Sequence, residues 1–315
     1  MIVATRQLGA TGLEVTELCM GTSPLASMPQ LYGYPVTAER AVATVEAVFD
    51  SDIRFIDTSN GYGDDGTAER RIGAAIAERG GLPDGVVLAT KVDPDPVTGD
   101  FSGERVFASY AESLERLGVE RVPLLYLHDP ERIPFEEAVE AGGPVDALVA
   151  LRARGLVGHI GVAGGPVGLM RRYLETGVFD VVLSHNRYTL VDRSAEELFG
   201  FARQHGIGVV NAAPYGGGML AKGPDVQSNY GYGERPGELA DAVRAMAEAC
   251  AEHGVPLPAA ALQFSLRSPL IDSTVVGVSS PERVAQTLGY AEWDIPEALW
   301  ARLEELVPSS QNWLG

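Results

Sequence analysis

Four residues of types that can move a proton lie at or near the ends of predicted strands. Asp57 belongs to the segment FIDT, Tyr62 follows five residues later in a glycine-flanked loop, Lys91 lies in VVLATKV and His128 in LLYLHD. Taken singly, each has an ordinary structural explanation, such as a turn-forming acid, a loop aromatic, a solvated charge or a hydrogen-bonded polar residue. Their positions at successive strand ends point to a common site.

Together these side chains could carry out general acid-base catalysis through a phenol. A free tyrosine has a pKa of about 10 and exchanges protons poorly near neutrality, whereas a neighbouring ammonium group favours the phenolate. We expect Lys91 to supply that ammonium group for Tyr62, and Asp57 to keep Lys91 charged and oriented. His128 could form a hydrogen bond to a carbonyl oxygen beside the phenol and so fix the reacting group.

For these residues to meet, their strands must be neighbours in one parallel sheet. Eight short apolar segments are predicted strands, at residues 18–22, 55–58, 86–92, 124–129, 159–164, 181–186, 208–214 and 273–279. Amphipathic segments between and after them are predicted helices, at residues 37–50, 67–79, 103–118, 145–155, 166–177, 195–206, 237–254 and 281–291. The alternation predicts a closed (β/α)8 barrel, in which chemistry takes place at the C-terminal ends of the strands.

The segments outside these units also have expected places. RQLGATGLEV near the N-terminus is typical of a β-hairpin and could cap the N-terminal end of the barrel, and PEALWARLEELVP adds an extra C-terminal helix. No early strand is followed by the GxGxxG pattern of a Rossmann sheet, and no linker or repeat divides the chain. We therefore expect residues 1–315 to form a single α/β domain, a (β/α)8 TIM barrel.

Composition narrows the classes of partner and location. The chain has 24 Lys and Arg against 43 Asp and Glu, and its formal net charge of −19 disfavours nucleic acid and anionic membranes as partners. Cys19 and Cys250 lie far apart and have neither disulfide-framework nor zinc-site spacing, so no metal is predicted. Because no signal-like leader or apolar run of about 18 residues is evident, we expect a cytoplasmic protein.

The segments FIDTSNGYG, LATKV and LYLHD resemble those that carry the Asp, Tyr, Lys and His tetrad of the aldo-keto reductases. The resemblance extends from RQLGATGLEV to SSPERV, which is nearly the whole chain. It implies a (β/α)8 oxidoreductase that transfers a hydride between NAD(P) and a carbonyl or alcohol. Tyr62 would then be the general acid in reduction and, as phenolate, the base in oxidation. Lys91 and Asp57 would adjust the pKa of the Tyr62 phenol, and His128 would orient the substrate.

The resemblance also implies a cofactor site along the rim of the barrel. Gly21, Thr22 and Ser23 would line the nicotinamide, and Asn186 would bind its carboxamide. The loop NAAPYGGGML would fold over the pyrophosphate, and VVGVSSPERV would bind the adenosine phosphate at a helix start, where backbone amides favour anions. The contacts expected in these two segments are Ala212, Pro214, Tyr215, Gly216, Gly277, Ser279, Ser280, Arg283, Gln286 and Thr287.

A few positions depart from the family pattern. Ala163 and Gly164 stand where many members carry Ser-Asn, so one pair of hydrogen bonds to the carboxamide is expected to be absent. Ala212 stands where many members carry an aromatic ring that stacks on the nicotinamide, and Gly277 where a lysine near the ribose phosphate is typical. The choice between NADP and NAD therefore stays open.

The segments NAAPYGGGML, VVGVSSPERV and SHNRYTL most resemble the dehydrogenases of D-threo-aldoses, L-fucose or L-galactose and the related pyridoxal dehydrogenases. This implies oxidation of an aldose to its lactone, with pyridoxal oxidation or general aldehyde and ketone reduction as alternatives. Substrate contacts are expected in two long loops, at residues 26–35 and 222–233, although these could equally be mobile surface loops. The candidate residues are Tyr32, Tyr34, Tyr230 and Tyr232.

Two functions of other classes also stay open. A Schiff-base lyase could use Lys91 to trap a carbonyl carbon as an imine, but it leaves PYGGG and VVGVSSPERV without a use. A regulatory subunit could bind the cofactor without turnover, although an intact tetrad argues against that. In the main interpretation the partner is a small sugar, alcohol or carbonyl compound, and the protein is a monomer or homo-oligomer.

Overall fold

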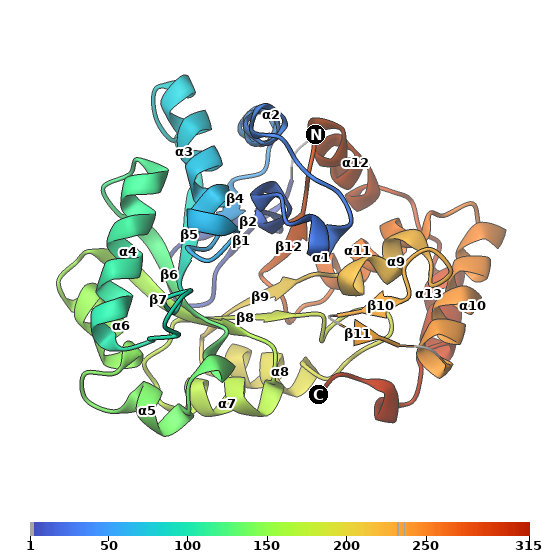
Figure 1. Cartoon of the computed structure of the whole chain (residues 1–315). Coiled ribbons are helices and arrows are strands. Elements are labelled where there is room, and N and C mark those ends of the chain that lie inside the picture. Colours follow the sequence, from blue (N-terminus) through green and yellow to red (C-terminus); the bar gives the residue numbers. More distant parts are fainter. Residues whose placement is uncertain (1–2, 232, 236) are drawn as a thin grey trace.

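A closed barrel of eight parallel strands forms the centre of the molecule, as the sequence predicts (Figure 1). The computed structural model describes residues 3–231, 233–235 and 237–315. Neighbouring strands follow chain order, and the last one closes the ring between the first and the seventh. The strands are β3 (Leu18–Gly21), β4 (Phe55–Asp57), β5 (Val87–Val92), β6 (Val122–His128), β7 (Val157–Gly164), β8 (Val181–His185), β9 (Gly208–Ala212) and β12 (Ser273–Gly277).

Helices surround the barrel and cover the outer faces of its strands (Figure 1). Their apolar faces pack against the outward-pointing side chains of the strands, while polar faces meet solvent. The helices of this layer are α2 (Ala38–Phe49), α3 (Thr67–Arg79), α4 (Gly103–Leu117), α6 (Pro144–Ala153), α7 (Val167–Glu175), α8 (Glu196–Gln204), α11 (Leu257–Leu266) and α12 (Pro281–Ala291). Shorter helices interrupt the connections, namely α1 (Pro29–Tyr32), α5 (Phe135–Val139) and α9 (Met219–Lys222).

The last connection of the barrel differs from the prediction. The predicted helix at 237–254 is α10 (Glu238–Glu252), but it packs on α11 and on α13 (Glu297–Glu305), at the side of the molecule (Figure 1). The helix that contacts β12 and α12 is α11, which the predicted elements do not include. Most of its side chains are buried, so its sequence lacks the alternation of apolar and polar residues that identifies a surface helix.

A hairpin closes the N-terminal end of the barrel, which confirms the expected cap. Its strands are β1 (Thr5–Gln7) and β2 (Glu14–Thr16). Leu8 and Val15 are fully buried and join a cluster with inward-facing residues of the barrel strands. Because this end is closed, the C-terminal rim is where a ligand can reach the strand ends.

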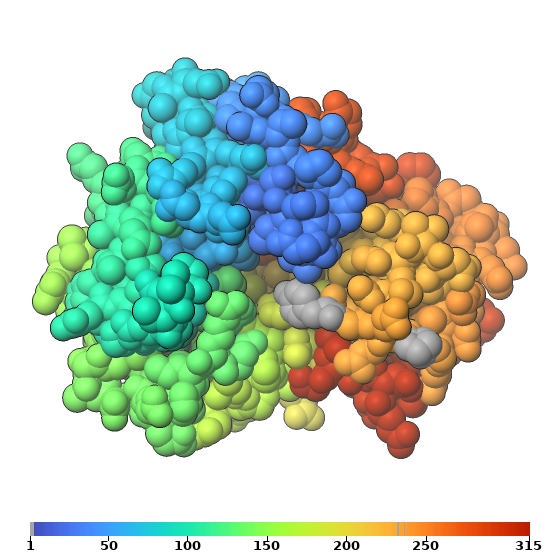
Figure 2. Space-filling view, viewed as in Figure 1, coloured from blue at the N-terminus to red at the C-terminus, as the bar shows by residue number. Residues whose placement is uncertain are grey.

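The opposite face carries the connections that follow the strands. Here α1, after β3, and the small hairpin of β10 (Asn229–Tyr230) and β11 (Gly233–Glu234), after β9, lie near the middle of the view in Figure 1. In Figure 2 the blue, green and orange parts of the chain border a hollow on this face.

Cys19 and Cys250 are both buried free thiols. Within the described ranges, none of the helices has the length and apolar character needed to cross a membrane.

Candidate active site

Lys91 connects the residues at the ends of β4 and β5. Its ammonium nitrogen donates hydrogen bonds to Asp57 Oδ1 at 2.6 Å, to the Thr58 carbonyl at 2.7 Å and to the Tyr62 hydroxyl at 3.1 Å. The Lys91 side chain is 1% exposed and that of Asp57 is 4% exposed. Three acceptors match the three N–H groups of an ammonium ion, so the pocket is built for a charged lysine.

Asp57 is held from the backbone side as well. The amide and the hydroxyl of Thr22, just after β3, donate to the Asp57 carbonyl at 3.1 and 3.0 Å. Burial raises the pKa of the Asp57 carboxyl, and the Lys91 ammonium group opposes that rise. The second carboxylate oxygen, Oδ2, is buried and has no hydrogen-bond partner within the described part of the chain.

Tyr62 is placed by the turn between β4 and α3. Its amide donates to the Ser59 carbonyl at 3.2 Å, and its carbonyl accepts from the Ala68 amide at 3.1 Å. The next residue, Gly63, has a φ of 83°, which favours glycine. The His128 ring meets the Tyr62 ring edge-on, with 5.6 Å between centroids and 79° between planes. The structure thus brings all four predicted tetrad residues together.

His128 has two carboxylates on opposite sides of its ring. Nδ1 lies 2.7 Å from Asp93 Oδ1 and 3.0 Å from Ser59 Oγ, while Nε2 lies 3.6 Å from Asp129 Oδ1. Burial lowers the pKa of His128, but Asp93 and Asp129 outweigh burial and raise it above its ordinary value. Burial likewise raises the pKa of Asp93, but His128, Ser59 and the Gly61 amide together lower it to about 2.

Asp93 is not among the predicted site residues, although a sequence signal for it exists. It directly follows β5 and lies two residues after Lys91. Side chains two apart in an extended segment point to the same side, so Asp93 can be expected to face the rim as Lys91 does. Asp129, Glu131 and His185, on the loops and strand ends nearby, are further polar residues that the prediction does not include.

Asn186 directly follows β8 in a left-handed backbone conformation, which Asn adopts more readily than most other residues. Its φ is 62°, and its side chain is almost fully buried. The side-chain nitrogen lies 3.1 Å from His185 Nδ1, whereas the buried oxygen Oδ1 has no hydrogen-bond partner in the described ranges. A buried acceptor of this kind fits an amide N–H, so Asn186 can bind the carboxamide of a nicotinamide.

The end of β3 supplies the other predicted nicotinamide contacts. Gly21 pairs in register with Gly277 of β12, and the buried Thr22 lies between Gly21 and Ser23. Ser23 Oγ accepts a hydrogen bond of 2.7 Å from the Tyr32 hydroxyl. Tyr32 therefore folds back onto the rim.

Two predicted tyrosines of these loops lie in different surroundings. Tyr34 is 37% exposed, and its ring centroid is 6.2 Å from that of Tyr32. Tyr230 is fully buried, and its hydroxyl bonds to the Asn186 carbonyl at 2.8 Å and to Thr189 Oγ1 at 2.7 Å. Tyr230 is therefore not an exposed aromatic side chain on a loop, because the β10–β11 hairpin folds inward. Tyr232 lies outside the described residues.

Tyr230 also explains one glycine of the NAAPYGGGML loop. Gly216 has a φ of 57°, and a Cβ built on it would lie 2.1 Å from the Tyr230 ring. The Gly216 carbonyl accepts a hydrogen bond from the Gly231 amide at 3.2 Å. The hairpin therefore holds this loop from outside. The other cofactor contacts predicted in the loop, Ala212, Pro214 and Tyr215, precede Gly216 in the chain.

The predicted adenosine site lies at the start of α12. Ser280, just after Ser279, is its N-cap, and its hydroxyl accepts from the Arg283 amide at 3.3 Å. Arg283 and Gln286 are exposed and bonded to each other at 2.6 Å, whereas the Thr287 hydroxyl donates to the Arg283 carbonyl at 2.8 Å. The helix start and Arg283 thus offer positive charge to an anion, while Thr287 is bonded within the helix.

One of the two departures in GVAGG, Gly164, has a packing reason. A Cβ at Gly164, the last residue of β7, would lie 2.7 Å from Pro130 Cδ and 3.1 Å from Glu131 Oε2. The Ala163 carbonyl accepts a hydrogen bond of 2.8 Å from the Asp129 amide. The loop after β6 thus occupies the space that a side chain at position 164 would need.

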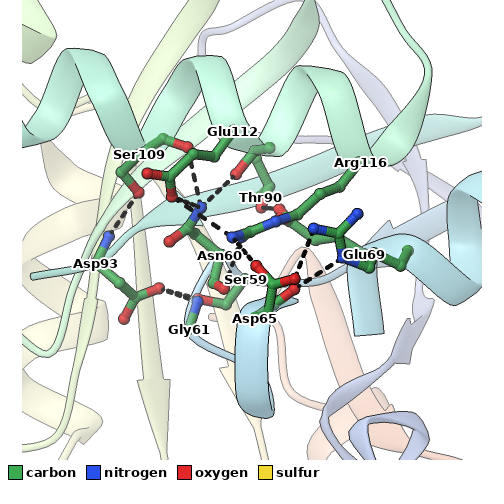
Figure 3. Close-up of polar contacts among 12 residues, drawn as sticks. Ser59, Asn60, Gly61, Asp65, Glu69, Thr90, Asp93, Ser109, Glu112 and Arg116 are labelled. Atoms are coloured by element: carbon green, nitrogen blue, oxygen red, sulfur yellow. Dashed lines mark hydrogen bonds and ion pairs between the residues drawn. The ribbon is translucent and has the colours of Figure 1, made fainter. Parts of the chain in front are cut away.

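A partly buried polar network behind the site holds the loop after β4 to α4 (Figure 3). The Asn60 amide group donates to the Ser109 carbonyl at 3.0 Å and to Glu112 Oε2 at 3.1 Å. Arg116 donates to the Asn60 carbonyl at 3.3 Å and forms ion pairs with Asp65 and Glu69. Because Asn60 lies two residues before Tyr62, this network fixes the loop that carries the phenol.

Comparison with known proteins gives an independent line of evidence. The model of the Aldo/keto reductase family matches residues 17–308. D-threo-aldose 1-dehydrogenase of a Pseudomonas species is 34% identical, over 95% of this chain and 97% of that protein. Pyridoxal 4-dehydrogenase of Microbacterium luteolum is 32% identical, over 95% and 96%. L-galactose dehydrogenase of Arabidopsis thaliana is 34% identical, over 91% and 87%.

A solved structure shares the fold. An aldo-keto reductase from Bacillus halodurans, in its holo form, superposes with a TM-score of 0.79. The alignment covers 98% of this chain and 97% of that one at 23% identity. At this identity the likeness concerns the architecture of the barrel.

Proposed function

Since this chain belongs to the aldo/keto reductase family, and is therefore an oxidoreductase that uses a nicotinamide dinucleotide, we propose that it oxidises an aldose to its lactone. The observation that carries the proposal is the position of Lys91 Nζ, 2.6 Å from Asp57 Oδ1 and 3.1 Å from the Tyr62 hydroxyl, beside the His128 ring. Acid-base chemistry through a phenol needs such a charge next to the phenol oxygen.

In the proposed oxidation, Tyr62 as phenolate accepts the proton of the substrate hydroxyl. The ammonium group of Lys91 stabilises the phenolate that must be present beforehand, and Asp57 stabilises the charge on Lys91. His128 positions the substrate oxygen through its Nε2 edge. When bound, the nicotinamide supplies the redox chemistry by accepting the hydride from the carbon that carries that oxygen.

The chain's own residues offer places for each part of the cofactor. The buried oxygen of Asn186, which has no hydrogen-bond partner among the residues that the structure describes, fits the carboxamide, and the glycine-rich loop from Gly216 brings backbone close to the rim. The start of α12 with Arg283 fits a phosphate. Gly277 stands in place of a cation, and Arg283 is the first basic residue after it in the sequence, so we leave the choice between NADP and NAD to experiment.

Polar groups beside His128 favour a substrate with several hydroxyls. Asp129, Glu131 and His185 follow or end neighbouring strands, and Asp129 Oδ1 lies 3.6 Å from His128 Nε2. Carboxylates accept hydrogen bonds from vicinal hydroxyl groups, which a sugar provides and a simple aldehyde lacks. We place Tyr34 and Tyr32 on the opposite side of the substrate, and assign Tyr230 to support of Asn186.

The geometry of Lys91 does not favour the Schiff-base alternative. A lysine that attacks a carbonyl must present a free lone pair, whereas Lys91 Nζ is surrounded by three acceptors at 2.6 to 3.1 Å. We further propose that residues 1–315 act as one domain on a small molecule in the cytoplasm. The buried free thiols and the net charge of −19 support that setting.

The test is a fluorescence titration with NADH and, separately, with NADPH, followed by oxidation assays with the preferred cofactor. The assays compare L-galactose and D-threo-aldoses with pyridoxal and with a simple primary alcohol. We expect the aldoses to give the highest kcat/KM and the Asp129→Asn variant to lose more kcat/KM on aldoses than on the simple alcohol. A higher kcat/KM on pyridoxal, or equal losses, would contradict the aldose assignment.

A further inference from the structure

We propose that Asp93 is a positioning residue that holds His128 with its proton on Nδ1 and its Nε2 toward the substrate oxygen. The inference deepens the proposed function, because it rests on the role assigned to His128. Its geometry can nevertheless be tested without substrate or cofactor. Asp93 contacts Nδ1, on the opposite side of the imidazole from Nε2, so it acts through His128 and not on the substrate itself.

Each oxygen of the Asp93 carboxylate has its own partners. Oδ2 accepts from the Gly61 amide at 2.7 Å and from the Ser59 hydroxyl at 2.5 Å, while Oδ1 lies 2.7 Å from His128 Nδ1. An ionised carboxylate can only accept hydrogen bonds, so the hydrogen between Oδ1 and the ring belongs to Nδ1. Nε2 is then the nitrogen left to face the substrate.

Asp93 is anchored on several sides, so its carboxylate cannot easily turn away. Its amide donates to Ser109 Oγ at 3.1 Å, as Figure 3 shows, and its carbonyl accepts from Arg105 Nε at 3.2 Å. A Cβ at Gly61 would lie 2.7 Å from Asp93 Cγ, which means that the loop after β4 closes directly over the carboxylate. The side chain of Asp93 is 5% exposed and that of His128 is 13% exposed.

Other charged and titratable groups around His128 come from four strand ends. Asp57 ends β4, Tyr62 lies in the loop after it, and Lys91 lies on β5. Asp129 and Glu131 follow β6, and His185 and Arg187 lie at the end of β8. Among the carboxylates in the described ranges, Asp93 is the one in hydrogen-bond contact with Nδ1, and Asp129 is the one near Nε2.

The ionisation of the two partners agrees with this arrangement. The pKa of Asp93 is lowered to about 2, so it is a carboxylate throughout the neutral range. The pKa of His128 is raised because Asp93 and Asp129 favour its charged form. The rise in the pKa of His128 widens the pH range in which His128 is charged and donates from Nε2 as well, which suits a group that binds a substrate oxygen carrying developing negative charge.

Asp93→Asn makes a prediction that a purely structural role would not make. The Gly61 amide and the Ser59 hydroxyl both donate toward the Oδ2 position, so the new side chain must place its oxygen there. Its NH2 group then faces His128 and donates to Nδ1, which can no longer carry the proton. We expect His128 to switch to the Nε2–H tautomer and its pKa to fall.

The experiment is heteronuclear NMR of protein with isotope-labelled histidine nitrogens, in the absence of cofactor and substrate. The chain has five histidines, and His128→Gln identifies the signal of His128 by its loss. On the basic side of its titration, wild-type His128 should be the Nδ1–H tautomer, and Asp93→Asn should show the Nε2–H tautomer. The control, Asp129→Asn, removes the carboxylate near Nε2 and should keep the Nδ1–H tautomer.

A wild-type spectrum with the proton on Nε2 would overturn the inference, and this outcome does not depend on whether any variant folds. An unchanged tautomer in a folded Asp93→Asn protein would overturn it as well. With substrate, the same variant should lower kcat/KM by up to roughly 100-fold, because the imidazole is no longer held in place, and leave cofactor affinity unchanged. Failure to bind either nicotinamide cofactor would sink the proposed function and leave the NMR result standing.

Discussion

At the scale of single residues, the buried pair of Asp57 and Lys91 is central to both stability and chemistry. Each charge is removed from water, so each depends on the other and on the Thr58 carbonyl. A pair of this kind costs desolvation free energy when it forms, and its main contribution is to hold a charge next to the Tyr62 oxygen. The positive charge beside the Tyr62 hydroxyl therefore depends on the Asp57–Lys91 pair remaining intact.

Asp57→Asn should strongly destabilise the protein, because it leaves the Lys91 ammonium group buried without a counter-charge. We expect the free energy of unfolding to fall by about 3–5 kcal/mol, measured by urea denaturation. The matched control is Asp241→Asn, which breaks a surface pair with Arg244 at 2.7 Å and should leave the urea midpoint unchanged. Equal effects of the two substitutions would contradict the account of the buried pair.

Single residues differ in how far the sequence predicts them. Asp57, Lys91 and His128 end or nearly end strands, so a list of strand ends finds them and the parallel sheet brings them together. Asp93 lies one residue past its strand, and a list that stops at the strand end does not include it. Tyr230 has an ordinary loop sequence, and only the folding of its hairpin over Gly216 buries it.

At the scale of elements, the contact between α3 and α4 connects packing with the site. Gly73 in α3 lies so close to the C-terminal end of α4 that a Cβ on it would be 2.0 Å from the Arg116 carbonyl. The same end of α4 carries Glu112 and Arg116, which bind Asn60 in the loop before Tyr62. A displacement of α4 should therefore also displace the loop that carries the Tyr62 phenol.

Gly73→Ala should destabilise the protein by about 1–3 kcal/mol, because the methyl group forces the two helices apart. The control is Gly289→Ala in α12, where nothing lies within 4 Å of the new Cβ. That variant should stabilise by roughly 0.5–1 kcal/mol, since alanine favours a helix interior. Urea unfolding of the two proteins checks the difference, and a destabilised Gly289→Ala with an unaffected Gly73→Ala would contradict it.

The helices and strands that the sequence predicts are those whose apolar residues follow a regular pattern. The barrel strands are short apolar runs between turn residues, and most helices alternate apolar and polar faces, so both are visible from the sequence. α11 is buried between the barrel and α10, and it has no polar face to reveal it. Its position in the last connection could be identified only from three-dimensional packing.

At the scale of the whole molecule, the excess of acids over bases lowers the stability of the folded state, because the negative charges repel one another. The net charge of −19 comes from 43 acids against 24 bases, and many of the ion pairs that offset it are on the surface. Salt screens both the repulsion and these pairs, but 43 acids against 24 bases leave a net charge of −19 that no base in the chain can offset.

Raising the salt concentration from about 0.01 M to about 0.1 M should therefore raise Tm, because the screening length falls from about 30 Å to about 10 Å. Differential scanning calorimetry at neutral pH measures the effect. A fall in Tm over this range would mean that surface ion pairs contribute more than the repulsion, and would contradict the prediction.

The measurement that tests the central claim most directly is the activity of Tyr62→Phe beside its affinity for the preferred nicotinamide cofactor. Loss of the phenol oxygen should lower kcat by about 10²- to 10⁴-fold and leave the cofactor Kd unchanged. The control is Tyr173→Phe, which removes a buried hydroxyl without a hydrogen-bond partner in the described ranges and should keep wild-type kcat. A Tyr62→Phe protein that binds the cofactor and turns over at the wild-type rate would contradict the role of Tyr62 and, with it, the proposed mechanism.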